Sequence, residues 1–208
     1  MDRERITISI KKNVLGFIDK TIDKINIRNR SHAIEYLVLK GLQRSDDKNA
    51  VILLGGKDAM KHISATEDIL KTLKSMGYEK VYLAVGFLAD KIEAKLGDGE
   101  KYNLDLEYLR DGEGSAGALL PLKKIFKSTF LVINLKEDNL FDLEDLVDFH
   151  KKQNAVATLA LVDQKTKEGI YAFEPDVFRH ISKGFSMLEE EVFPKLSKRG
   201  ELVGFLQF

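Results

Sequence analysis

The sequence predicts an α/β protein in two parts: a short strand with two helices, then a mostly parallel sheet covered by helices on both faces. From residue 49 onward, near-continuous apolar runs alternate with amphipathic segments of helical period, the pattern of strands buried on both sides. Before this region, "RITISI" (Arg5 to Ile10) alternates apolar and polar residues, as a half-buried strand does. The polar stretch "RSDDKN" (44–49) separates the two patterns. We therefore predict domains at 1–45 and 49–208.

The amino-acid composition excludes several kinds of functional site. The 208 residues are 44% hydrophobic and 32% charged, as in a soluble globular protein. Cysteine is absent and the four histidines lie far apart in the chain, so we expect no thiolate chemistry and no metal site of histidines. We predict no cofactor. No apolar run approaches the roughly 18 residues of a membrane span, and the N-terminus does not resemble a signal peptide. We expect no membrane partner and a cytoplasmic location.

The net charge of zero hides an asymmetry. Up to residue 48 there are 11 Lys and Arg against 7 Asp and Glu, which gives +4; since the whole chain has 33 of each, the remainder holds 22 against 26, which gives −4. A basic arm on an acidic body favours an anionic partner for the arm.

The first region predicts one strand and two helices. Three isoleucines alternate with Arg5, Thr7 and Ser9 in the strand, and apolar residues spaced three or four apart follow in two segments. Ser31 is a suitable N-cap for the second helix. A lone strand cannot form a sheet, so we expect an identical strand from a second copy to pair with it. This predicts a homodimer or a higher homo-oligomer, whose two-stranded ribbon would fit the major groove of DNA.

This region resembles the ribbon-helix-helix DNA-binding family. The resemblance rests on "RITISI", on the helix expected from Asn13 to Ile25 and on "NRSHAIEYLVLKGL" (Asn29 to Leu42). It implies double-stranded DNA as a partner. It also implies base contacts from the outward strand residues and a phosphate contact at the start of the second helix, made by Arg5, Thr7, Ser9, Arg30, Ser31 and His32. The alternative is an edge strand and helical hairpin packed on the second domain.

The second region predicts five strands and four helices in alternation. The strands are expected at Ala50–Leu54, Val81–Val85, Leu104–Leu109, Phe130–Asn134 and Val156–Val162. The helices are expected at Thr66–Met76, Leu88–Lys95, Ala116–Phe126 and Leu143–Lys152. Ligands of such sheets bind at the carboxyl ends of the strands, which here are Gly55-Gly56, Gly86, Asp111 to Gly117 and Asn134 to Asp138.

This region is similar to the sugar-nucleotide pyrophosphorylases, nucleotidyltransferases of a Rossmann-like fold that join a sugar 1-phosphate to a nucleoside triphosphate. The similarity rests on "AVILLGG" (Ala50 to Gly56), "LKSMGYEKVYLAVGFLADKIEAKLGDG", "GSAGAL" (Gly114 to Leu119), "FLVIN", "DLEDLVDFHKKQNAVATLALV", "GIYAFEPDVF" and "EEEVFPKL", in that order along the chain. It implies a nucleotide-binding cleft at the strand ends.

The departures from that family fall on its phosphate and metal groups. Asp58 stands where the family has a glycine, Met60 where it has an arginine, and Lys136 where it has a metal-binding aspartate; its Pro-Lys-Pro segment is missing. We therefore predict a catalytically silent domain that is not an enzyme, with no catalytic residue and no metal. A slip of one or two residues, which would make Glu137 or Asp138 the metal ligand, stays open.

The segments that correspond to base and sugar recognition are retained. They predict a pocket for a sugar nucleotide, a sugar phosphate or a nucleotide bound without metal. Its expected residues are Leu54, Gly55, Gly56, Lys57, Gly86, Ser115, Ala116, Gly117 and Lys136. The alternative is that the glycines serve only tight turns between strands and helices.

Taken together, these features predict a dimeric, sequence-specific DNA-binding transcription regulator whose silent nucleotidyltransferase-like domain is a ligand sensor or an oligomerisation module. Two alternatives remain. One is the DNA-binding component of a partition or plasmid-maintenance system. The other is an active sugar-phosphate nucleotidyltransferase with an N-terminal dimerisation arm.

Overall fold

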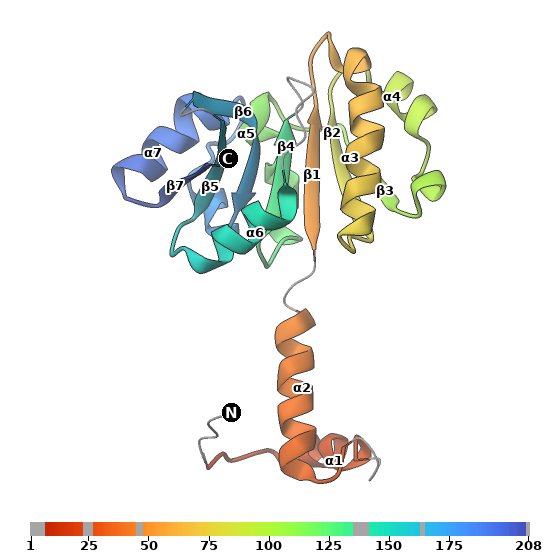
Figure 1. The fold of residues 1–208 in the computed structure, drawn as a ribbon, viewed down its shortest axis with the longest axis vertical. Coiled ribbons are helices and arrows are strands. Elements are labelled where there is room, and N and C mark those ends of the chain that lie inside the picture. The colour runs from red at the N-terminus through yellow and green to blue at the C-terminus, as the bar shows by residue number, and fades with distance from the viewer. Residues whose placement is uncertain (1–6, 23–26, 45–47, 135–141, 163–164, 207–208) are drawn as a thin grey trace. The chain divides into compact units, whose positions relative to one another are not determined.

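The computed structural model describes residues 7–22, 27–44, 48–134, 142–162 and 165–206. The chain divides into two compact units, Met1–Asp47 and Lys48–Phe208 (Figure 1). No described helix is long and apolar enough to cross a membrane.

The smaller unit contains the helices α1 (Lys12–Lys20) and α2 (Arg30–Arg44). Ile18, Ile27 and Ala33 form its small buried cluster. The Asn29 side chain accepts the His32 N–H at 3.0 Å, so Asn29, and not the predicted Ser31, caps α2. Arg30 donates to both carboxylate oxygens of Asp19, at 2.7 and 2.9 Å, and these hydrogen bonds lower the pKa of Asp19. The two helices are thus joined by a charged pair as well as by a small apolar core.

The predicted N-terminal strand is not shown. Arg5 and Ile6 lie outside the described residues, residues 7–11 have no strand assignment, and the Ile8 side chain is 51% exposed. A ribbon would need a second strand to supply its hydrogen bonds, and the smaller unit of one chain offers none among its described residues. The first helix also ends at Lys20, earlier than predicted.

The larger unit is built on a seven-stranded sheet with the order β3-β2-β1-β4-β6-β5-β7. Its strands are β1 (Asn49–Leu54), β2 (Lys80–Val85), β3 (Asp105–Leu109), β4 (Phe130–Asn134), β5 (Ala157–Val162), β6 (Lys165–Phe173) and β7 (Leu202–Leu206). Neighbouring strands are parallel except where β6 pairs with β4 and β5. The prediction of a mostly parallel α/β sheet is confirmed.

Helices cover both faces of this sheet (Figure 1). The helices are α3 (Ile63–Ser75), α4 (Ala89–Leu96), α5 (Gly114–Gly117), α6 (Leu143–Lys152) and α7 (Phe193–Lys198), with shorter turns η1 (Ala59–His62), η2 (Glu100–Tyr102), η3 (Leu120–Lys124), η4 (Pro175–Arg179) and η5 (Leu188–Val192). Along β1, Ile52 belongs to the core shared with α3, α4 and α6, whereas Val51 and Leu53 belong to the core shared with η3 and α7. Because successive side chains of a strand point to opposite faces, β1 contributes apolar side chains to the core on each side of the sheet.

The helix predicted at Ala116–Phe126 is interrupted. It consists of the four-residue α5 and the separate 3-10 turn η3, with Pro121 in the first positions of that turn. Proline has no N–H to donate, so it suits the start of a new turn better than the interior of a helix.

A buried polar contact joins α6 to the sheet. His150 is 1% exposed; its Nδ1 lies 2.7 Å from the Thr158 hydroxyl and its Nε2 lies 3.3 Å from Glu174 Oε1. The second contact is too poorly aligned for a hydrogen bond, so it is mainly electrostatic. Glu174 also accepts from the Thr129 hydroxyl at 2.6 Å. Burial alone would raise the pKa of Glu174, but its contacts with His150 and Thr129 outweigh burial and lower that pKa below 4.5.

We expect this carboxylate to contribute to stability in an acid-dependent way. Because its pKa is lower in the folded state, its contribution is complete above the unfolded pKa and is lost as the pH falls through the folded pKa. Urea unfolding between about pH 3 and pH 7 should show a shallower loss of stability in acid for Glu174→Gln than for the unmodified protein. Glu79→Gln, at an exposed position, is the control, and equal acid profiles for all three proteins would contradict the assignment.

Candidate functional site

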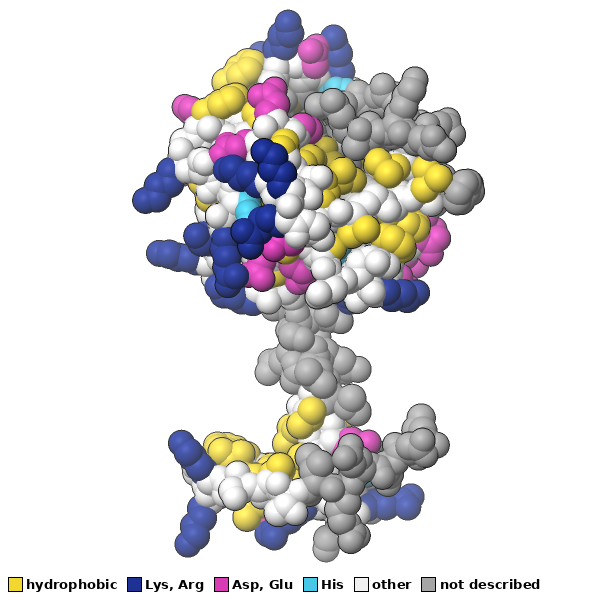
Figure 2. Space-filling model, turned by 90° about the vertical axis from the view of Figure 1, so that its left-hand side faces the viewer, with side chains coloured by type: hydrophobic (Ala, Val, Ile, Leu, Met, Phe, Trp, Pro, Cys, Tyr) yellow, Lys and Arg dark blue, Asp and Glu magenta, His cyan; other side chains and the backbone are white. Residues whose placement is uncertain are grey.

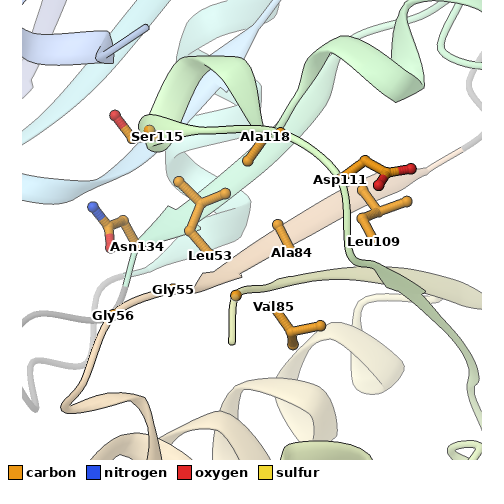
Figure 3. Close-up of a pocket in the computed structure, with 13 residues that line it drawn as sticks. Leu53, Gly55, Gly56, Ala84, Val85, Leu109, Asp111, Ser115, Ala118 and Asn134 are labelled. Carbon is orange, nitrogen blue, oxygen red and sulfur yellow. The ribbon is translucent and has the colours of Figure 1, made fainter. Parts of the chain in front are cut away.

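A cleft of about 360 Å³ opens at the carboxyl ends of β1, β2 and β4 (Figure 3). Strand β1 lies between β2 and β4, so the chain order reverses here, and such points form the binding crevices of open α/β sheets. The residues lining the cleft are Leu53, Gly55, Gly56, Ala84, Val85, Gly86, Leu109, Asp111, Gly112, Gly114, Ser115, Ala118 and Asn134.

The cleft has two different ends. In Figure 3, Asn134 and the Gly55-Gly56 turn lie at one end, Leu109 and Asp111 lie at the other, and the Leu53 and Ala84 side chains lie between them. The middle is therefore apolar, whereas each end offers polar groups. A ligand with a flat, weakly polar body and polar groups at both ends suits this arrangement.

The loop after β1 carries free backbone donors beside the first of these ends, where Gly56 lines the cleft. Gly56 has a φ of 94°, a conformation that glycine adopts at little cost. Within the part of the chain that the structure describes, no hydrogen bond takes up the amides of Gly56, Lys57 and Asp58. Successive free amides in a turn form a site for an anion.

The charges on this loop favour an anion as well. Lys61 Nζ lies 2.6 Å from Asp58 Oδ1, and the hydrogen bond from Lys61 lowers the pKa of Asp58. The negative charge of Asp58 is thus compensated within the loop. Lys57 is exposed and forms no ion pair with a described residue, so its positive charge is left for a ligand.

The turn that begins α5 is fixed by hydrogen bonds with the segment that contains Ser186 and Leu188. The amides of Ala116 and Gly117 donate to the Ser186 carbonyl at 3.0 and 3.1 Å, and both residues are buried. The Ser115 hydroxyl accepts the Leu188 N–H at 2.9 Å. The amides of Ala116 and Gly117 are therefore occupied and do not offer donors to an anion in the cleft.

The residues predicted for a ligand pocket fall into three groups. Gly55, Gly56, Gly86 and Ser115 line the cleft. Lys57 lies on the loop beside it, whereas Leu54, Ala116 and Gly117 are buried behind its surface. Lys136 lies outside the described residues.

Of the residues predicted to contact DNA, Arg5 lies outside the described residues. The others are exposed on the smaller unit, with Thr7 and Ser9 before α1 and Arg30, Ser31 and His32 at the start of α2. The Arg30 guanidinium is already paired with Asp19.

Two polar residues of the cleft were named from the sequence only as strand ends and were left out of the predicted pocket. Asp111 and Asn134 both line it. Their position just after β3 and at the end of β4 was the available signal, because carboxyl ends of parallel strands meet at one edge.

The described residues do not provide a metal site. No group of three His, Asp or Glu among them is close enough to hold an ion, and Asp111 and Asn134 lie at opposite ends of the cleft (Figure 3). Glu137 and Asp138, the alternative ligands considered from the sequence, lie outside the described residues.

Comparison with known proteins gives consistent similarities. The chain is 27% identical to a mannose-1-phosphate guanylyltransferase of Mycobacterium tuberculosis, over 74% of this chain and 56% of that protein. It is 26% identical to a UTP–glucose-1-phosphate uridylyltransferase of Synechocystis, over 64% of this chain and 47% of that protein. The chain thus spans about half the length of the curated relatives it matches. No family model matches.

Solved structures share the fold. HddC from Yersinia pseudotuberculosis superposes with a TM-score of 0.60 at 16% identity, over 76% of this chain and 90% of that one. The inositol-1-phosphate CTP transferase from T. maritima superposes with a TM-score of 0.54 at 14% identity, over 76% and 85% of the two chains. These similarities confirm the resemblance of the larger unit to nucleotidyltransferases. They give no support to a ribbon-helix-helix domain.

The predicted function was wrong. The relatives named above are enzymes of nucleotidyl transfer, which contradicts the prediction of a DNA-binding transcription regulator. It also contradicts the prediction that the domain is silent and the protein not an enzyme. One of the four departures behind that prediction carries less weight in the structure: Asp58 stands where the family has a glycine, but Lys61 compensates its charge and Lys57 forms no ion pair with a described residue. Lys136, another of them, lies outside the described residues.

Proposed function

We propose that the protein is a nucleotidyltransferase that joins a nucleoside monophosphate unit to a sugar 1-phosphate in the cleft at the ends of β1, β2 and β4. The observation that carries the proposal is the loop after β1, where the free amides of residues 56–58 adjoin the unpaired Lys57. The relatives support it, since they include transferases of guanylyl and uridylyl groups to sugar phosphates.

The reaction follows from the two ends of the cleft. The triphosphate lies on the loop after β1, where amides and Lys57 offset its charge, and the base lies toward Leu109 and Asp111. A phosphate oxygen of the sugar phosphate attacks the α-phosphorus, a new P–O bond forms, and the bond from that phosphorus to the bridging oxygen breaks. Pyrophosphate leaves with the bonding electron pair. Lys57 stabilises the charge that develops on this leaving group.

Asp111 supports guanine as the base. A carboxylate only accepts hydrogen bonds, and the Watson–Crick edge of guanine carries adjacent N–H donors that two carboxylate oxygens can engage together. The structure of HddC complexed with GMP-PN, with a TM-score of 0.59 at 15% identity over 77% of this chain and 90% of that one, is consistent with a guanine nucleotide in this fold.

We expect Asp111→Asn to raise the KM for GTP about tenfold and to leave the KM for UTP nearly unchanged, because the amide replaces one acceptor by a donor. Release of pyrophosphate with a sugar 1-phosphate acceptor, in a buffer containing Mg²⁺, measures both constants. The matched control is Asp105→Asn, an exposed position on β3 away from the cleft lining. An equal change for GTP and UTP would refute base selection by Asp111.

We also propose that the smaller unit is a self-association arm. Its helices expose large apolar side chains, with Phe17 at 67% and Val38 at 53%, and among its described residues the buried cluster consists of Ile18, Ile27 and Ala33. So small a core is marginal without a partner.

Phe17→Asp should reduce self-association, because a charge would have to be buried between copies. Sedimentation velocity measures the oligomeric state, with Lys12→Asp as the control at an exposed polar position of the same helix. If both variants associate to the same extent as the unmodified protein, the smaller unit is not a self-association arm.

A further inference from the structure

A second cavity lies within the larger unit, apart from the cleft. It has a volume of about 300 Å³ and is lined by Leu159, Tyr171, Glu189, Phe193, Pro194, Ser197 and Leu202. None of these residues lines the cleft. They come from β5, β6, β7, η5 and α7, so the cavity lies between α7 and the end of the sheet that carries β7. That side of the unit faces the viewer in Figure 2, where apolar side chains reach the surface among charged ones.

The walls of this cavity are mainly apolar. Leu159, Phe193 and Leu202 belong to the core on this face of the sheet or pack against it, whereas Pro194 and Ser197 are exposed. The cavity thus has an apolar floor and an open rim. Its volume is at the lower end of the range for small-molecule pockets, about 300–1,000 Å³.

Glu189 provides the charge at this site. Its Oε1 accepts from the Tyr171 hydroxyl at 3.0 Å and its Oε2 accepts from the Ser115 hydroxyl at 3.2 Å. These neutral donors fix the orientation of the carboxylate without neutralising it. No described Lys, Arg or His forms an ion pair with Glu189, although the neighbouring Glu191 is paired with Lys195 at 2.7 Å.

An oriented carboxylate with unused lone pairs at the side of an apolar cavity is complementary to an organic cation. Each carboxylate oxygen accepts up to two hydrogen bonds, so each has room for one more. An ammonium group would supply both the charge and the donors, and hydrogen bonds between charged groups are stronger than neutral ones. A neutral molecule of the same shape would gain only the apolar contact.

We propose that this cavity is a second ligand site, which takes a small primary amine with an aromatic or aliphatic body and holds its ammonium group on Glu189. The body packs against Leu159, Phe193 and Leu202. The cavity shares no lining residue with the cleft, although Glu189 accepts from Ser115, which lines the cleft. The proposal does not rest on the proposed transfer reaction.

The test compares benzylamine with benzyl alcohol, which has the same shape and no charge at neutral pH. Chemical shifts of the Leu159 and Leu202 methyl groups, followed by NMR during titration of the full chain, report binding without any measurement of turnover. We expect benzylamine to bind about tenfold more tightly than benzyl alcohol, as one additional charged hydrogen bond would give.

Three variants locate the site. Glu189→Gln keeps the shape and removes the charge, so its affinity for benzylamine should fall about tenfold, to that for benzyl alcohol. Ser197→Phe, at the exposed rim, should fill the cavity and abolish the shifts. Lys198→Phe, at the adjacent exposed position outside the lining, should bind benzylamine normally. The proposal would be overturned by equal affinity for the two probes or by the absence of a shift of either methyl group. It would also be overturned if Glu189→Gln bound benzylamine as tightly as the unmodified protein.

Discussion

Lys57→Ala should lower kcat/KM for pyrophosphate release about 100-fold, the size of effect found when one preorganised group is removed from a developing charge. Lys57 is the exposed cation on the loop after β1, and no described acidic residue pairs with it. The free amides of residues 56–58 remain in the mutant, so activity should fall without disappearing. Circular dichroism should show an unchanged fold, because the side chain makes no packing contact that the fold requires.

Two further variants separate charge from position on this loop. Lys57→Arg keeps the positive charge and should recover part of the activity, although its planar guanidinium does not reproduce a compact ammonium group. Lys61→Ala leaves Asp58 without the partner that lies 2.6 Å away, and the freed carboxylate should weaken triphosphate binding through repulsion. If Lys57→Ala retains full activity while Lys61→Ala loses it, the phosphates do not lie on Lys57.

Gly114→Ala should cost at least about 3 kcal/mol of folding free energy, through a strained backbone and a collision together. Gly114 has a φ of 79°, and an added Cβ would lie 2.4 Å from the Ser186 carbonyl oxygen and 3.0 Å from the Met187 sulfur. The carbonyl belongs to the backbone that also accepts the Ala116 and Gly117 amides. It cannot move away without breaking those bonds, so the wall of the cleft should be disrupted as well.

Gly200→Ala is the matched control for this substitution. Its φ of 69° is also positive, but an added Cβ would meet nothing within 4 Å. It should therefore cost only the backbone strain, about 1–2 kcal/mol. Chemical unfolding compares the two, and equal losses would show that the contact with Ser186 adds nothing.

The sheet was the most predictable part of the fold. Strand β4 (Phe130–Asn134) and helix α6 (Leu143–Lys152) have the predicted bounds, because each has a strong periodic pattern and a clear start. The Asp142 side chain caps α6 by accepting the amides of Glu144 and Asp145. Strands β6 and β7 were both missed. The edge position of β7 and its Gly204 leave it only partly buried. Its pairing with β5 depends on contacts across the sheet.

The site was predictable where it depends on neighbours in the chain. Gly55 and Gly56 follow β1 directly, and the Asp58–Lys61 pair was available from its spacing of three residues. The wrong prediction of a silent domain counted Asp58 without this pair, beside Met60, Lys136 and the missing Pro-Lys-Pro segment. Contacts between distant segments gave no such signal. Ser115 meets Glu189 across 74 residues of sequence, and only the folded chain brings η5 behind the turn of α5.

The most direct test of the proposed function is identification of the product. The unmodified protein, incubated with GTP, a sugar 1-phosphate and Mg²⁺, should form a guanosine diphosphate sugar and pyrophosphate in equal amounts, measured by mass spectrometry and by phosphate release in the same sample. Gly86→Trp, which places a large side chain in the cleft lining, should form neither. If a panel of nucleoside triphosphates and sugar phosphates yields no nucleotide sugar above the level of Gly86→Trp, the cleft does not catalyse nucleotidyl transfer.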